Sequence, residues 1–323
     1  MVACSSQPVH KSTAPAGAEP AAKGSATARA RTSYGVEINA HPAEPLPVVH
    51  LSSDPIDNRE AHDAQAHDIW QSVRDGFSLS GLEDSARVLH YESWYQSEPN
   101  YLRLVTRRAR PYLYFILEEI ERRRLPTELA LLPIVESAYI PFAYSRSHAA
   151  GLWQFIPETG RLYGLKQNWW YDGRRDIFAS TMAALDYLEA LNELFEGDWF
   201  HALAAYNAGP GRVLREIDKN RALGQSIAYE DLDLSAQTRN YIPKLLAVKA
   251  MIQNPDRFGI ELWPVPDAPY LSAVDIDTPL DLELAAEFAD MDLNAFHLLN
   301  PGSSQWATDP SGPHRVLLPV DRV

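Results

Sequence analysis

The chain has 323 residues, 46% of them hydrophobic and 22% charged, which is typical of a globular protein with room for one large or two modest domains. Its formal net charge of −14 argues against nucleic acid as the main partner. The sequence contains no apolar run near the roughly 18 residues that cross a bilayer. Because Cys4 is the single cysteine, a disulfide framework within the chain is excluded.

The first residues, Met1 to Ser6, place small side chains before Cys4, as at the end of a bacterial lipoprotein signal. Residues 5–58 are rich in Ala, Pro, Ser, Thr and charged residues, which predicts a disordered tether. Such a tether suits an anchored protein and favours lipidation of Cys4, with a signal segment encoded further upstream. A plain disordered terminus with an incidental cysteine is the alternative.

Helical periodicity runs through the middle of the chain, with apolar residues recurring every three or four positions. The predicted helices cover residues 61–77, 83–96, 101–110, 111–124, 128–139, 176–195, 198–207, 209–217 and 235–254. Pro133 predicts a kink just before Glu136, and Pro243 predicts an interruption of the last long helix. Nothing between residues 61 and 254 has the pattern of a strand pair, so we expect a mostly helical domain.

The composition changes at residues 261–269, where three prolines predict a linker. Beyond it, β-like runs at 270–276 and 314–320 enclose helical patterns at 280–290 and 292–300. The predicted fold is therefore mainly α, followed by a small βααβ module that is marginal as a domain by itself.

Four short islands carry polar or aromatic residues against apolar stretches. They are Glu136-Ser137, GLWQFIPETG (151–160), AYNAGPG (205–211) and TRNYIPKLLA (238–247). Each has an ordinary structural interpretation when taken singly. Glu136 can be a solvated helix residue, and Gln154 can bond a loop backbone. Tyr206 and Tyr241 can be core aromatics, and Asn207 can end a helix before Gly209. Four such islands in one chain make those separate interpretations weak.

In this order the islands resemble the motifs of the lytic murein transglycosylases with a soluble-lytic-transglycosylase domain. The resemblance is closest to the membrane-bound lytic murein transglycosylase D type, which LALLPIVESAY (129–139) and WWYDGRRD (169–176) also match. It runs from about Asp68 into the C-terminal module. The resemblance implies a goose-lysozyme-like helical fold and non-hydrolytic cleavage of the β-1,4 bond between N-acetylmuramic acid (MurNAc) and N-acetylglucosamine (GlcNAc), leaving 1,6-anhydroMurNAc ends.

The same resemblance implies roles for individual residues. Glu136 is the expected general acid and base, and Gln154, Tyr206, Asn207 and Tyr241 are expected to line a glycan groove. Ser137 is expected beside the Glu, as support or as a sugar contact. The implied partner is the peptidoglycan glycan strand, met by a monomer in the periplasm that is lipid-anchored to the outer membrane. No cofactor or metal is expected, since the ten histidines are scattered.

The domain boundaries follow from these patterns together. They are 1–58 for the tether, 59–125 for an N-terminal helical extension, 126–260 for the catalytic domain, 261–269 for the linker and 270–323 for a LysM-like module. This type usually continues into LysM repeats, and the acidity of 270–323 argues against autonomous glycan binding by the module.

The chemistry of a single carboxyl can be argued from the residues. A glycosidic oxygen leaves readily only when protonated, and apolar neighbours keep a carboxyl protonated near neutral pH. Ordinary glycosidases use two carboxylates. If the muramyl 6-hydroxyl is the nucleophile, no second carboxylate is needed to activate water.

One departure from the family pattern is His148, which stands where relatives often have Gly; we expect it to make a loop contact. Two other functions remain open. A hydrolytic muramidase or chitinase-like enzyme would need a second carboxylate, for which Asp172 and Asp176 are the candidates. A catalytically idle peptidoglycan-binding scaffold is the other, although it would have no need of Glu136.

Overall fold

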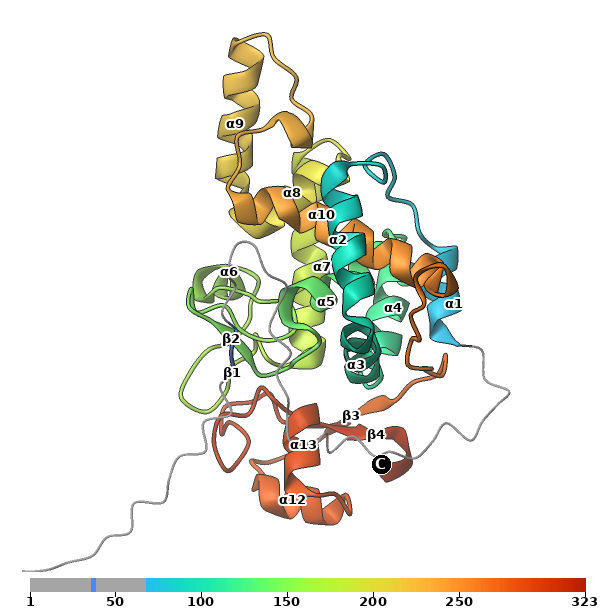
Figure 1. The fold of residues 1–323 in the computed structure, drawn as a ribbon. Helices are drawn as coiled ribbons and strands as arrows, with labels where there is room; N and C mark the ends of the chain where they lie inside the picture. The colour runs from blue at the N-terminus through green and yellow to red at the C-terminus, as the bar shows by residue number, and fades with distance from the viewer. Residues whose placement is uncertain (1–35, 39–67) are drawn as a thin grey trace, which may run out of the picture. The chain divides into compact units, whose positions relative to one another are not determined.

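The structure, a computed structural model, describes residues 36–38 and 68–323. Helices dominate the described part of the chain, which confirms the mainly α prediction (Figure 1). The first six helices are α1 (Ile69–Asp75), α2 (Ala86–Ser97), α3 (Pro99–Ala109), α4 (Leu113–Arg122), α5 (Leu132–Ser137) and α6 (Pro157–Leu162). The next five are α7 (Ile177–Leu194), α8 (Trp199–Ala208), α9 (Pro210–Ala222), α10 (Ala236–Gln253) and α11 (Pro255–Phe258). Two 3₁₀ turns, η1 (Thr127–Leu131) and η2 (Tyr229–Asp231), join them.

Two long helices organise the core. α10 packs against α2, α8 and α5, and α7 packs against α8 and α4 (Figure 1). Asp176 and Asp198 cap α7 and α8, each accepting a hydrogen bond from a main-chain N–H of the first turn. Trp70 and Trp153 are fully buried in the same apolar core as residues of α5, α8 and α10, so the core fixes the positions of these helices.

Two expectations about proline were wrong. Pro133 lies in the first turn of α5, after η1 has ended at Leu131, so it stands at the start of a helix and not inside one. In the first turn the missing N–H of proline has no intrahelical partner to lose. Pro243 lies inside α10, which nevertheless continues from Ala236 to Gln253. Burial of Ile242, Pro243 and their neighbours holds that helix together across the lost hydrogen bond.

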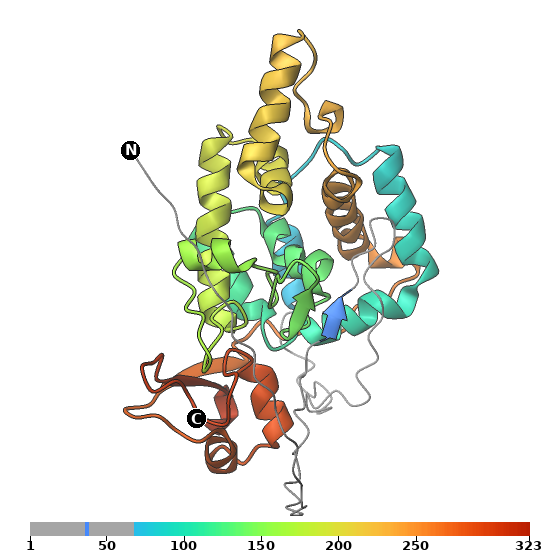
Figure 2. The same ribbon diagram turned by 90° about the vertical axis from the view of Figure 1, so that its left-hand side faces the viewer.

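The sequence also missed a strand. β2 (Ala143–Ser145) pairs in parallel with β1 (Val36–Ile38), which lies far away in the sequence (Figure 2). With three residues, β2 is too short for the alternation that reveals a strand. Main-chain bridges from Tyr144 to Ala150 and from Ala150 to Phe155 continue this extended segment toward Gln154.

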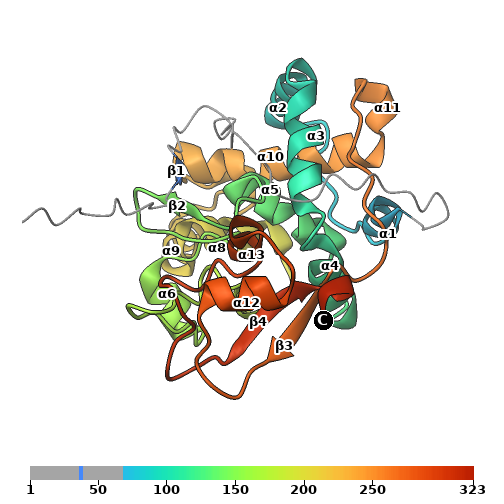
Figure 3. The same ribbon diagram turned by 90° about the horizontal axis from the view of Figure 1, so that it is seen from below.

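The βααβ prediction for the C-terminal module is confirmed. β3 (Leu271–Asp275) and β4 (Arg315–Pro319) pair antiparallel, with Leu271 opposite Pro319. Between them come α12 (Leu282–Phe288) and α13 (Leu293–Leu299), and the turn η3 (Val320–Arg322) follows (Figure 3). The module has its own small apolar core around the fully buried Phe296.

Polar contacts join the module to the loop between α6 and α7. Asp309 accepts bonds from Lys166 at 2.8 Å and Asn168 at 2.6 Å, and Arg315 pairs with Asp176 at 2.9 Å. A module with a small core of its own is therefore joined to the helical domain by charge and hydrogen bonds, and also by Leu271, Leu299 and Leu317, which belong to the main apolar core. Within residues 68–323, no helix has the length and apolar character needed to cross a membrane.

Candidate active site

Glu136 lies in the last turn of α5, where two unusual backbone conformations end the helix. Ala138 and Tyr139 have φ of 50° and 55°, in the left-handed region that residues other than glycine rarely adopt. The Tyr139 ring is buried, and its hydroxyl donates to the Ala130 carbonyl at 2.7 Å. Such strain persists only where the surrounding packing enforces it, and it gathers at functional sites.

The carboxyl of Glu136 is held by Tyr241 of α10, whose hydroxyl donates to Oε1 at 2.6 Å. Burial raises the pKa of Glu136 to about 7, although the Tyr241 hydrogen bond and the positive charge of Lys244 act in the opposite direction. The carboxyl is therefore divided between its acid and its anion near neutral pH. A group with that property can both donate and accept a proton.

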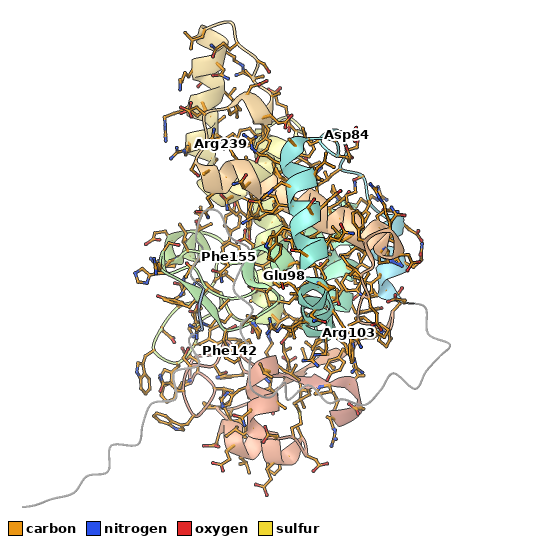
Figure 4. The ribbon with its side chains drawn as sticks, in the orientation of Figure 1. Asp84, Glu98, Arg103, Phe142, Phe155 and Arg239 are labelled. Carbon is orange, nitrogen blue, oxygen red and sulfur yellow. The ribbon has the colours of Figure 1, made fainter. Side chains whose placement is uncertain are left out.

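Ser137 is fully buried and connects α5 to the neighbouring loop. Its hydroxyl donates to the Leu152 carbonyl at 2.9 Å, within the segment that Phe142 and Phe155 mark in Figure 4. Of the two expected roles, this geometry favours support over contact with a sugar. The next residue in that segment, Trp153, donates from its indole to Thr181 of α7 at 3.0 Å.

Gln154 also has a backbone in the left-handed region, with φ of 50°. Its amide nitrogen donates to the carbonyls of Gly151 at 2.9 Å and Ala143 at 3.3 Å. Those two bonds fix the side chain and leave the amide oxygen as the acceptor that can meet a ligand. The hydrogen bonds to the loop backbone that the sequence suggested for Gln154 are thus present, and they orient its side-chain amide.

Tyr206 and Asn207 are partly buried at the end of α8, which stops at Gly209, a residue with φ of 85°. The Tyr206 hydroxyl donates to the Trp153 carbonyl at 2.8 Å. Burial and the nearby Glu136 raise the pKa of Tyr206 well above its ordinary value, so the phenol stays neutral. Its ring lies 5.5 Å from that of Tyr187 on α7.

The structure thus brings Tyr241 into contact with Glu136, and Tyr206 lies near enough for the charge of Glu136 to act on its phenol. Ser137 and Gln154 flank them through the segment between β2 and α6. Asn207 follows Tyr206 in α8, and its place beside this group rests on that position. Cys4 lies outside the residues that the structure describes.

Sequence reasoning missed Lys244. It lies three residues after Tyr241 in the fourth island, and its charge acts on Glu136. The spacing of Tyr241 and Lys244 could have revealed it, because residues three apart in a helix share one face.

His148 has a backbone φ of 62°, in the left-handed region that glycine adopts without strain. Its Nδ1 lies 2.7 Å from the Tyr144 hydroxyl, and its carbonyl accepts from Arg174 at 2.6 Å. Those are the loop contacts expected from the sequence.

The two candidate second carboxylates serve structural roles. Asp172 pairs with Arg174 at 2.8 Å. Asp176 caps α7 and accepts from the Tyr171 hydroxyl at 2.8 Å. Within residues 68–323 no group of three or more His, Cys, Asp or Glu side chains could hold a metal ion. The arrangement supports proton transfer by one carboxyl among neutral phenols and amides.

Comparison with known proteins shows which family the chain resembles. Residues 114–228 match the model of the Transglycosylase SLT domain. Residues 270–323 match that of the Lytic transglycosylase MltD, LysM-like domain. The chain is 40% identical over 252 residues to membrane-bound lytic murein transglycosylase D of Escherichia coli K12, covering 78% of this chain. The aligned residues cover 56% of the length of that relative, so this chain matches about half of it.

More distant similarities are also found. The chain is 30% identical over 172 residues to membrane-bound lytic murein transglycosylase C of Glaesserella parasuis, covering 46% of this chain and 47% of that protein. Among solved structures, the 70 kDa soluble lytic transglycosylase of Escherichia coli aligns with a TM-score of 0.39 and 20% identity, over 55% of this chain and 32% of that one.

The helical domain with its single shielded carboxyl is thus a transglycosylase SLT domain. The chain belongs to the lytic murein transglycosylase family, and its C-terminal module matches the LysM-like domain of the D type.

Proposed function

We propose that this protein is a lytic transglycosylase, a carbon-oxygen lyase that cleaves the β-1,4 bond between MurNAc and GlcNAc in peptidoglycan. The observation that carries the proposal is the Glu136 carboxyl in an SLT domain, bonded to Tyr241 and with a pKa of about 7. Near neutral pH a large share of this carboxyl is protonated and ready to serve as the general acid.

The reaction that fits one carboxyl has two proton transfers. Glu136 gives its proton to the glycosidic oxygen, the bond from that oxygen to the muramyl anomeric carbon breaks, and the 2-acetamido group stabilises the positive carbon. The Glu136 carboxylate then takes the proton from the muramyl 6-hydroxyl, whose oxygen bonds to the anomeric carbon. A 1,6-anhydroMurNAc end results, and Glu136 is protonated again.

The neighbouring residues suit a glycan substrate. We assign Gln154, Tyr206, Asn207 and Tyr241 to the walls of the glycan groove, because amides and neutral phenols orient N-acetyl groups and hydroxyls without adding a competing charge. Ser137 supports α5 from beneath, through its bond to the Leu152 carbonyl.

The hydrolytic alternative is less well supported. It requires a second carboxylate that activates water. Asp172 and Asp176, the two candidates from the sequence, are already bonded to Arg174 and to the start of α7.

The proposed setting is the periplasm, with the chain acting as a monomer on peptidoglycan and tethered to the outer membrane by lipid on Cys4. A relative of this chain is membrane-bound, which supports an envelope location. Mass spectrometry of the native membrane-associated protein tests the anchor, and a terminus without lipid would contradict it.

The activity is tested by incubating the protein with purified sacculi and measuring soluble muropeptides. We expect release by the wild type and at least a hundredfold slower release by Glu136→Gln, the usual cost of losing a positioned general acid. Binding to sacculi with no release would favour the idle scaffold. Near-normal activity of Glu136→Gln would overturn the assignment of the catalytic residue.

A further inference from the structure

Lys244 is a partly buried lysine held at a defined place beside the candidate site. It follows Tyr241 by three residues on α10, so both side chains lie on the same helix face. The Lys244 ammonium lies 5.4 Å from the centroid of the Tyr91 ring. Tyr91 belongs to α2, which packs against α10 (Figure 1). A ring face attracts a cation and fixes its position.

Two groups of α10 act on Glu136 of α5, and Glu136 in turn acts on a third group, on α8. Tyr241 of α10 bonds the carboxyl, Tyr206 of α8 contributes a neutral phenol, and Lys244 of α10 contributes a positive charge. Burial lowers the pKa of Lys244 from its ordinary value, and the negative charge of Glu136 acts on Lys244 in the opposite direction. Tyr91 faces Lys244 from the side of α2 and stays neutral, because burial raises its pKa.

A general acid and base that works through a single carboxyl must pass through its anion in every turnover. Burial alone makes that anion costly and the acid too weak to protonate a leaving oxygen. A positive charge nearby lowers the free energy of the anion. If that charge does not form a direct salt bridge with the carboxylate, the carboxylate can still take a proton back.

We propose that Lys244, held on the ring of Tyr91, is a positioning residue that stabilises the Glu136 carboxylate formed when the proton moves to the leaving oxygen. Lys244 acts through Glu136 and need not touch the sugar. Its catalytic consequence rests on the proposed transglycosylase function, whereas its effect on Glu136 itself can be measured without any substrate.

The direct test is a titration of Glu136 by carbon NMR of protein labelled at the Glu side chains. The lost signal in Glu136→Gln assigns the resonance. Without the positive charge the carboxylate is less stable, so Lys244→Met should raise the Glu136 pKa by about one unit. Lys244→Arg keeps the charge and should stay within about 0.3 units of wild type. Lys244→Gln, a polar neutral replacement, should repeat the Met result.

A matched control removes an equal charge elsewhere. Lys219→Met takes a lysine from α9 that pairs with Glu216 at 3.0 Å, and we expect no shift at Glu136. If Lys244→Met and Lys244→Gln both leave the Glu136 titration unchanged in folded protein, the inference is wrong. It is also wrong if Lys219→Met produces the same shift, since net charge would then be the cause.

Activity supplies the second measurement. The alkaline limb of kcat/KM, where Glu136 loses its proton, should move to higher pH in Lys244→Met, and kcat should fall about tenfold with little change in KM. Lys244→Arg should restore both. A purely structural lysine would lower stability without moving this limb. If wild-type protein releases no muropeptides, the proposed function fails, and the titration still decides whether Lys244 acts on Glu136.

Discussion

Replacing Glu136 by Gln should change how stability depends on pH. Folding raises the pKa of this carboxyl from 4.5 to about 7, a difference of about 2.5 units. At 1.36 kcal/mol per unit, the ionised carboxyl costs the folded state about 3 kcal/mol at alkaline pH. Glu136 is partly exposed, so water screens it and this value is an upper bound.

The sign follows from proton binding. The folded state holds the proton more tightly than the unfolded chain, so the contribution of Glu136 to stability is fully present below pH 4.5. It is lost as pH rises through about 7. Gln is neutral throughout and nearly the same shape, so the variant lacks this loss. Relative to wild type, Glu136→Gln should gain up to about 3 kcal/mol between pH 4 and pH 9.

Urea unfolding of both proteins, followed by tryptophan fluorescence at several pH values, measures this difference. Subtracting the two free energies at each pH cancels the groups that they share. Glu158→Gln, on the exposed side of α6, controls for the loss of one negative charge. A Glu136→Gln difference that stays constant within about 0.5 kcal/mol from pH 4 to 9 would show a solvated carboxyl and refute the reasoning.

Three further changes test neighbouring parts of the account. Tyr241→Phe removes the hydrogen bond that stabilises the Glu136 anion, so the pKa of Glu136 should rise. In a pH-rate profile, the alkaline limb of kcat/KM should then move to higher pH. Ser137→Ala removes a buried hydrogen bond and should cost about 1 to 2 kcal/mol in urea unfolding, with the Glu136 titration nearly unchanged. Glu128→Gln breaks the buried pair with Lys249, 3.0 Å apart, and should cost about 3 to 5 kcal/mol in the same assay. A loss below 0.5 kcal/mol would contradict that last estimate.

Much of the fold could be predicted because its signals are local. The helical periodicity of residues 69–97 and 177–253 and the βααβ order of 271–319 are recorded in neighbouring residues. Pro133 and Pro243 were misread because their effect depends on where a helix begins and on what surrounds it. The partner of β2 is about a hundred residues away, which no local pattern reveals.

The site divides in the same way. Motif order grouped Glu136, Tyr206 and Tyr241, and the structure places them together. The buried bond of Ser137 and the field of Lys244 at Glu136 depend on segments that meet only in the folded chain. Sequence neighbours therefore suggested which carboxyl is special, whereas its proton affinity is set by contacts across α5, α8 and α10.

The central claim is that one carboxyl passes a proton between two oxygens of the substrate without using water as the nucleophile. Digestion of sacculi in water enriched in oxygen-18, followed by mass spectrometry of the muropeptides, tests it most directly. We expect anhydro ends, each fragment lighter by one water than its hydrolytic counterpart and free of the label. Reducing muramyl ends that carry one oxygen-18 would contradict the claim and show that water is the nucleophile.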